Sequence, residues 1–175
     1  MTVRSLLADS SSSGSWTLAA DRSSVKFSNK TLWGLFTVKG EFTDVTGSGA
    51  IGEDASVSGR LIIRADSLHT GIGKRDEHLR SPDFFDTDAS PDIIIEVTGA
   101  TPTGEHTADV TATLTVRGTT LPLPVQATIT RPGNDTIHVV GRATIDRTAW
   151  GVSGNMAGMV PVTTALVADT TFLKS

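Results

Sequence analysis

The sequence predicts an all-β protein built around a closed barrel of about eight antiparallel strands. Thr, Val and Ile favour strands, and they recur in short runs in which apolar and polar residues alternate. Gly, Asn and Pro separate these runs at short intervals, as turns do. Because short connections join antiparallel neighbours, eight such strands can close into a barrel wide enough for side chains or one small ligand.

Nine segments show this pattern and are expected to be strands. They are residues 16–20, 25–29, 31–43, 57–65, 92–100, 107–116, 121–129, 137–145 and 159–172. The clearest alternation lies between Val57 and Ala65. The glycine-rich stretch from Gly47 to Gly52 is expected to be a hairpin turn. Pro122 and Pro124 lack a backbone N–H, so their strand is expected at an edge or loosely paired.

One charged stretch, residues 73–86 (GKRDEHLRSPDFFD), interrupts the series of strands. Lys74 to Arg80 is long enough for one or two helical turns. They should end before Pro82, because the residue before a proline is pushed out of the α region. In such a helix Leu79 would face inward, near Phe84 and Phe85. The sequence therefore predicts a short helical plug on the β structure.

The length of 175 residues fits one domain, which the strands place at residues 16–175. Residues 1–15 include a run of serines and are expected to be a flexible lead-in. The net charge of −4 argues against a nucleic-acid partner, which requires a basic face. The chain has no cysteine, which excludes disulfides and thiol sites.

The location expected from the sequence is cytoplasmic. No apolar run reaches the roughly 18 residues of a transmembrane helix, so no stable membrane insertion is expected. The first 15 residues also lack the apolar core of a secretory signal.

The plug holds the densest group of titratable side chains. We favour a structural role, in which these residues make hydrogen bonds that hold the helix to the barrel. The residues of this predicted polar plug are Arg75, Asp76, His78 and Arg80.

Two chemical roles are alternatives for the same stretch. His78 could act as a general base beside Asp76 or Glu77. It could also join His69 and Asp66 in a metal site, since imidazole and carboxylate suit zinc or iron. Residues two apart point to different sides of a helix, which disfavours both roles. We therefore expect no catalytic residue, no metal and no cofactor.

Small side chains at inward positions predict a cavity inside the barrel, although tightly filled barrels also contain such residues. The small inward residues are Gly59, Ala65, Ala112, Gly141 and Ala143. Asp146 and Arg147, which precede Trp150, fit either a ligand clamp or an ion pair in the turn after a strand, and we favour the ion pair.

Four stretches of the chain form a recognisable set. They are SSVKFSNK with WGLFTVKGEF (23–30 and 33–42), ADSLHTGIGKRDEHLRSPDFFD with SPDIIIEVTG (65–86 and 90–99), ATLTVRGTTLPLPV (112–125) and ATIDRTAWGV (143–152). With this set the chain resembles the YceI-like family, a group of lipocalin-like proteins that bind isoprenoid lipids. The resemblance covers Trp16 to about Ala168, and RDEHLRS–DFF followed by LTVRGTT is its most specific part.

The resemblance implies an eight-stranded antiparallel, lipocalin-like barrel with the short helical segment beside it. It also implies an apolar channel that holds an isoprenoid lipid, of quinone or polyprenyl type, with the head group toward the mouth. Binding, storage or transport would then be non-catalytic. The residues expected to line the channel are Phe27, Leu32, Trp33, Phe36, Leu61, Ile63, Leu68, Leu79, Phe84, Phe85, Ile93, Ile95, Leu114, Ile145, Trp150, Met156 and Met159.

Two features depart from the family pattern. Family members often carry a histidine shortly after the strand of Phe27, where Lys30 and Thr31 stand here. If that histidine contacts the head group, this chain would prefer another head group or none. Many relatives are periplasmic, and this chain shows no signal.

Two other functions stay open at this point. The protein could be a lipid-modifying enzyme that acts on a bound head group with His78 as base. It could also be a structural or stress-response module whose barrel is filled by its own side chains. A homodimer stays open as well, because barrels of this family often pair.

Overall fold

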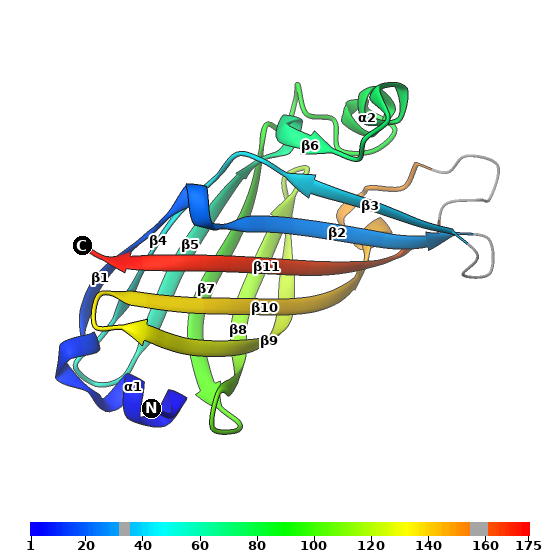
Figure 1. Ribbon diagram of the computed structural model, residues 1–175. Helices are drawn as coiled ribbons and strands as arrows, with labels where there is room; N and C mark the ends of the chain where they lie inside the picture. The colour runs from blue at the N-terminus through cyan, green and yellow to red at the C-terminus, as the bar shows by residue number, and fades with distance from the viewer. Residues whose placement is uncertain (32–35, 155–160) are drawn as a thin grey trace.

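The computed structural model describes residues 1–31, 36–154 and 161–175. Figure 1 shows long antiparallel strands around one interior, with helix α1 (Val3–Ala8) and helix α2 (Gly73–Arg80) at different ends. The strands are β1 (Gly14–Leu18), β2 (Ser24–Thr31), β3 (Phe36–Phe42), β4 (Val45–Ile51), β5 (Val57–Arg64), β6 (Leu68–His69), β7 (Asp92–Pro102), β8 (Thr107–Val116), β9 (Thr119–Gly133), β10 (Thr136–Asp146) and β11 (Thr163–Lys174). Short 3₁₀ helices lie between them: η1 (Ser10–Ser12), η2 (Ala20–Arg22), η4 (Ala65–Ser67) and η5 (Arg147–Trp150).

Eight of these strands close into a barrel. Their hydrogen-bonded order is β1-β4-β5-β7-β8-β9-β10-β11, and β11 pairs back onto β1, with Trp16 opposite Lys174 and Leu18 opposite Phe172. Every pair in this ring is antiparallel. The predicted eight-stranded antiparallel barrel is therefore confirmed.

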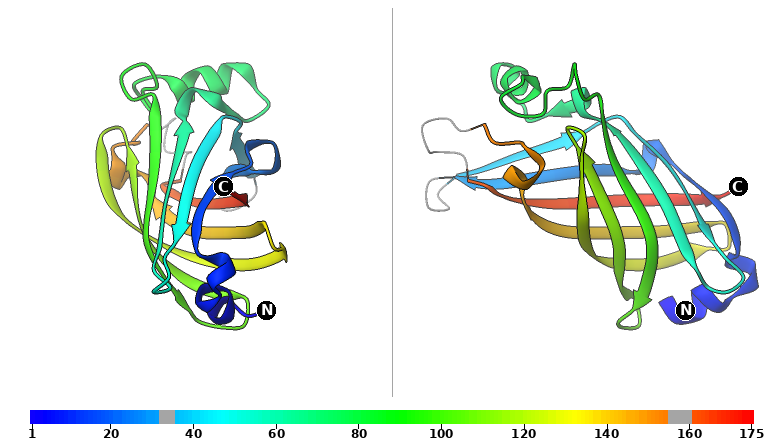
Figure 2. Two further views of the ribbon diagram at one scale, coloured as in Figure 1. Left: turned by 90° about the vertical axis from the view of Figure 1, so that its left-hand side faces the viewer. Right: turned by 180° about the vertical axis from the view of Figure 1, so that it is seen from behind.

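Strands β2, β3 and β6 extend the sheet beyond the closed ring. β11 pairs with β1 near its C-terminus and with β2 through residues 165–169, so β2 continues the line of β1 after η2. β3 pairs with β2 on one side and with β6 on the other. Figures 1 and 2 show β6 and α2 together at this end of the molecule. The predicted helical plug is thus present, and turns follow α2 through Phe85.

Strand β4 corrects one expectation. Gly47 to Gly52 is not a hairpin turn: residues 45–51 form a strand, and the turn to β5 follows at residues 52–56. A Cβ on Gly47 would lie 2.5 Å from Leu61 Cδ2 and 2.9 Å from the carbonyl oxygen of Arg60. Glycine is typical of a strand where a neighbouring chain approaches this closely. Gly47 therefore allows close packing within a strand, whereas Gly52 begins the turn.

Within the described parts of the chain, the proline-containing half of β9 pairs with a strand on one side only. Pro122 and Pro124 lie opposite Thr113 and Thr111 of β8, whereas pairing with β10 begins at Gln126. The expectation of an edge or loosely paired position is met, because a proline cannot donate to a second neighbour. The expected strands at 31–43 and 159–172 include residues outside the described part, and their described portions lie in β2, β3 and β11.

The expected flexible lead-in, residues 1–15, is instead a packed part of the fold. Thr2 caps α1 by accepting a hydrogen bond of 3.1 Å from the Ser5 N–H. Val3, Leu6 and Leu7 are buried, with 1, 3 and 7% of their surface exposed. Their spacing of i, i+3 and i+4 is one helical face. The serine-rich composition predicted a flexible lead-in, but burial of this apolar face packs the segment against the barrel.

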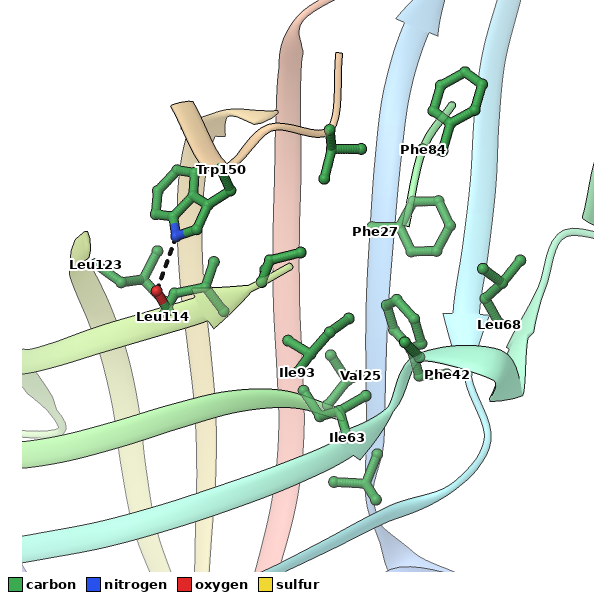
Figure 3. Close-up of a cluster of buried hydrophobic side chains, with 14 of the residues drawn as sticks. Val25, Phe27, Phe42, Ile63, Leu68, Phe84, Ile93, Leu114, Leu123 and Trp150 are labelled. Carbon is green, nitrogen blue, oxygen red and sulfur yellow. Dashed lines mark hydrogen bonds between the residues drawn. The ribbon is translucent and has the colours of Figure 1, made fainter. Parts of the chain in front are cut away.

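The buried apolar side chains form two clusters. The larger one gathers under the plug and includes Phe27, Phe84 and Trp150 (Figure 3). The smaller one joins α1 to the other end of the barrel through Leu6, Trp16 and other residues. The interior between these two clusters is where a ligand could be held.

Candidate functional site

An apolar cavity of about 340 Å³ runs inside the barrel. Every second residue of β10 from Ile137 to Ile145 faces it. The segment from Ile137 to Ile145 is nine residues long and covers roughly 26 Å of strand at about 3.3 Å per residue. The cavity is therefore a channel, and its volume lies in the range of about 300–1,000 Å³ that is typical of small-molecule sites.

Small residues keep the middle of this channel open. Gly59, Ala112, Gly141 and Ala143 all belong to its wall, as their inward positions predicted. Ala65 does not line the channel, because it lies in η4 at the end of β5 and is buried in the core with 1% exposure. The barrel is thus not filled at its axis by its own side chains.

The plug closes one end of the channel with apolar side chains. Leu79, Phe84 and Phe85 line the channel, although all three belong to the segment outside the ring of strands. Phe85 lies edge-on to Phe42 with ring centroids 5.8 Å apart, and its centroid is 6.5 Å from that of Phe27. We call this end of the channel the plug end.

Trp150 completes the plug end from η5. Its indole Nε1 donates a 2.8 Å hydrogen bond to the carbonyl oxygen of Leu114, which fixes the ring against β8 (Figure 3). The buried indole N–H has a partner, so the ring can present an apolar face to the channel. Trp150 is 5% exposed and Leu114 3%.

Most of the other residues expected to line the channel are also in its wall. They are Phe27, Leu61, Ile63, Ile93, Ile95, Leu114 and Ile145. They lie on β2, β5, β7, β8 and β10, and period-two alternation turns them inward. These strands together form a continuous apolar wall.

Two expected lining residues are elsewhere. Phe36, at the start of β3, is 63% exposed and is not part of the channel wall. Leu68 is fully buried, because β6 pairs it with Phe42 and packs it into the core behind the wall. Leu32, Trp33, Met156 and Met159 lie outside the described residues.

Leu68 is therefore expected to contribute to the stability of the fold and not to ligand binding. Replacing it with Ala is expected to lower the free energy of unfolding by about 2–5 kcal/mol, the cost of a buried Leu-to-Ala change. Chemical denaturation measures this value. Leu173→Ala is the control, because Leu173 is 39% exposed and its truncation should cost far less. A Leu68→Ala protein as stable as the control would contradict the assignment.

The charged residues of the plug make hydrogen bonds to its own turns and to neighbouring backbone. Asp76, only 4% exposed, accepts hydrogen bonds from the N–H and hydroxyl of Thr70. Arg75 donates to Thr70 Oγ1 at 2.8 Å and to the Thr70 carbonyl at 2.9 Å. Arg80 donates to the carbonyls of Asp66 and Leu68 at 3.0 and 2.8 Å. These contacts fit the predicted structural role.

His78 is the titratable residue of the plug with the most suggestive position. It lines the channel, its Nε2 lies 3.0 Å from Asp83 Oδ2, and its ring meets Phe84 edge-on at 5.2 Å. His69 pairs with Asp76 instead, at 3.5 Å. Among the residues that the structure describes, no group of three or more His, Asp or Glu side chains is placed to hold a metal ion.

Arg147 makes contacts beyond the predicted ion pair with Asp146, to which it is electrostatically attracted. Its side chain is turned into the fold and 7% exposed, and it lines the channel. It donates to the carbonyls of Pro161 and Val152, and its guanidinium carbon lies 5.7 Å from the centre of the Phe84 ring. Burial lowers the pKa of this guanidinium. Asp146 caps η5 by accepting a 2.9 Å hydrogen bond from the Thr148 N–H.

Three further lining residues were not predicted from the sequence. Asn29 is buried and donates to Thr164 Oγ1 at 2.8 Å and to two nearby carbonyls. Period-two alternation with Phe27 could have placed it inward. Leu6 and Leu7 line the opposite end of the channel, and the signal that could have found them is their i, i+3, i+4 spacing with Val3.

The fold and the channel together define a class of protein: a closed antiparallel barrel around an elongated apolar interior. Solved structures of this architecture are similar to the chain. They include BcnA of Burkholderia cenocepacia (TM-score 0.80, 19% identity, 88% of this chain and 98% of that one). A polyisoprenoid-binding domain of Saccharophagus degradans implicated in plant cell wall breakdown is also similar (TM-score 0.75, 19% identity, 91% and 98%).

Within this class, the chain belongs to the YceI-like family, whose domain model matches residues 16–174. Curated relatives include a UPF0312 protein of Pseudomonas syringae pv. tomato, 40% identical over 73 residues (42% of this chain, 38% of the relative). Another is from Vibrio parahaemolyticus, 29% identical over 140 residues (78% and 65%). The chain matches less than two thirds of the length of these relatives. The family resemblance seen in the sequence is confirmed.

Among the described residues, no helix has the length and apolar character needed to cross a bilayer.

Proposed function

We propose that this protein is a non-catalytic carrier that holds one long isoprenoid lipid, of quinone or polyprenyl type, in the channel. The observation that carries this proposal is the continuous apolar wall from Ile137 to Ile145 and the plug. Each CH₂ group buried there gains roughly 0.8 kcal/mol, so a long chain needs no strong polar contact to bind. The name of the Saccharophagus degradans domain, a polyisoprenoid-binding protein of the same fold, supports the choice of lipid.

The proposal places the lipid tail along the strands and the head group toward the plug end. There the channel meets Arg75, His78 and Arg147, while its other end meets Leu6 and Leu7. Charged and polar side chains favour a hydrated or polar group, and apolar side chains favour the tail. The orientation follows from this difference between the two ends.

Quenching of tryptophan emission tests the proposal. Trp16 and Trp150 both line the channel, one at each end, so a quinone bound inside should quench them. A quinone with a long prenyl tail is expected to quench saturably, and a tail-less quinone with the same ring is not. Equal quenching by both would show that the tail does not enter the channel and would reject the proposal.

An enzyme that acts on the head group is the second candidate, because His78 and Asp83 together have the geometry of an acid–base pair at the channel. The two side chains are 37 and 70% exposed, and an exposed pair contributes only about 0.2–1 kcal/mol. Changing His78 to Gln should therefore alter the affinity for a prenyl quinone by no more than about fivefold.

The same variant separates the two functions. Mass analysis of the lipid after prolonged incubation with the wild-type protein should return the starting compound. If a product forms with the wild-type protein and not with His78→Gln, the protein is an enzyme and the carrier proposal fails.

A further inference from the structure

The N-terminal segment lies at the end of the barrel opposite the plug. Figure 1 shows α1 beside the turn that joins β9 and β10, far from α2. The Val3 N–H donates a 2.8 Å hydrogen bond to the carbonyl of Glu105, in the turn between β7 and β8. The segment therefore crosses the rim of the barrel where two hairpins end.

Two leucines of this segment face the channel. Leu6 and Leu7 pack with Trp16, Ile51 and Ile137 in the smaller apolar cluster, and all five line the cavity. Ile137 is the last inward residue of β10 at this end. We call Leu6, Leu7 and Trp16 the channel floor.

Hydrogen bonds fix the floor to the barrel. Arg131 of β9, whose side chain is 4% exposed, donates to Asp9 Oδ2 at 3.1 Å and to Ser12 Oγ at 2.8 Å. It also donates to the carbonyl of Asn134 in the β9–β10 turn at 2.7 Å. Trp16 Nε1 donates to the Ser12 carbonyl at 2.9 Å. A buried arginine with several acceptors holds its partners in one arrangement, so the floor is a fixed wall.

The leucines of the floor lie outside the residues that match the family model, which begin at residue 16. The strands of the family fold thus build the sides of the channel, and a segment before the family match closes its end. Leu6 and Leu7, unlike Trp16 of β1, are thus separate from the strands of the barrel.

We propose that Leu6 and Leu7 limit the length of the apolar chain that the channel accepts. This inference rests on the proposed function, because it assigns a length limit to the same channel. A tail that reaches the floor gains apolar contacts with each added carbon until it meets these leucines. Further carbons must then fold back or remain in water, so affinity stops rising at a defined length.

Calorimetric titrations with two ligand series test the proposal. The series are straight-chain primary alcohols and all-trans prenols, each of increasing length. For the wild-type protein, affinity should rise with length and level off at a cut-off. The double variant Leu6→Ala/Leu7→Ala should shift that cut-off to longer chains, and Leu7→Trp should shift it to shorter ones. Arg4→Ala, on the exposed side of α1, should leave it unchanged.

The outcomes separate the floor from the identity of the lipid. A cut-off that both leucine variants leave unchanged would overturn the floor and leave the carrier proposal intact. A cut-off that moves for the alcohols, with no prenol bound, would support the floor and reject the isoprenoid. Binding of neither series by the wild-type protein would overturn both. Because the two variants change volume in opposite directions, loss of folding in one leaves the other as the test.

Discussion

Replacing Ala143 by Trp is expected to weaken the binding of a long isoprenoid chain by about 100-fold. Ala143 lies in the middle of β10 and faces the channel, so an indole there occupies the space of the lipid tail. Excluding three to four methylene groups costs about 3 kcal/mol, or about two powers of ten in Kd. Isothermal titration calorimetry of the variant and the wild-type protein gives the ratio of their Kd values directly. This measurement does not depend on tryptophan emission, which the new indole would change.

The matched control is Thr144→Trp. Thr144 is the next residue of the same strand and is exposed on the outer face of the barrel. The Thr144→Trp variant adds the same indole ring to the same strand, but outside the channel, because successive side chains of a strand point to opposite faces. Both variants should keep the β-sheet circular dichroism spectrum. Equal affinities of the two variants would show that the ligand does not occupy the channel.

Replacing Arg117 by Met is expected to speed lipid exchange by about 10- to 100-fold. Arg117 follows β8, and its Nη1 donates to the carbonyls of Pro82 and Phe84 in the plug, at 2.9 and 2.8 Å, and to that of Gly151 after η5, at 3.0 Å. A hydrogen bond to a charged group contributes about 1.5–3 kcal/mol, so its loss makes opening of the plug easier by that amount. Stopped-flow transfer of a fluorescent prenyl lipid to vesicles measures the rate.

Arg117→Met should change the rate far more than the affinity, since an easier opening speeds entry and exit alike. Arg22→Met, at an exposed arginine of η2, is the control for removal of one positive charge. Exchange at the wild-type rate in Arg117→Met would mean that the plug does not limit access to the channel.

The barrel and its plug could be predicted because their signals are local. Period-two alternation placed Leu61, Ile63 and Ile145 on inward faces, and the proline after Ser81 placed the end of α2 within one residue. Small inward residues, such as Gly141 and Ala143, also predicted an open space along the barrel axis. These features depend on neighbours in sequence.

Features that depend on distant partners were not visible in the sequence. The stretch that begins at Gly47 has the glycine-rich composition of a turn. Only the close approach of β5 shows why a strand needs glycine at this position. The sequence predicted an ion pair of Arg147 with its neighbour Asp146, but it did not show that Arg147 also binds carbonyls up to 14 residues away. Leu68 and Phe36 share the apolar character of the lining residues, and only strand pairing shows that they do not line the channel.

The channel floor was hidden for a similar reason. The serine-rich composition of residues 1–15 predicted a flexible segment. The contacts that order this segment come from Arg131, which is more than one hundred residues later in the chain. The helical face of Val3, Leu6 and Leu7 was the available signal. A short segment of this kind folds through tertiary contacts, because isolated helices of this length are not stable in water.

Native mass spectrometry of freshly purified protein, followed by organic extraction of the bound material, tests the central claim most directly. A channel of this size and apolar character should retain one lipid through purification. The expected result is a discrete added mass that extracts as an isoprenoid and identifies the head group. A bare protein mass that stays bare after incubation with long-chain prenyl quinones would contradict the claim that the channel is a site for an isoprenoid lipid.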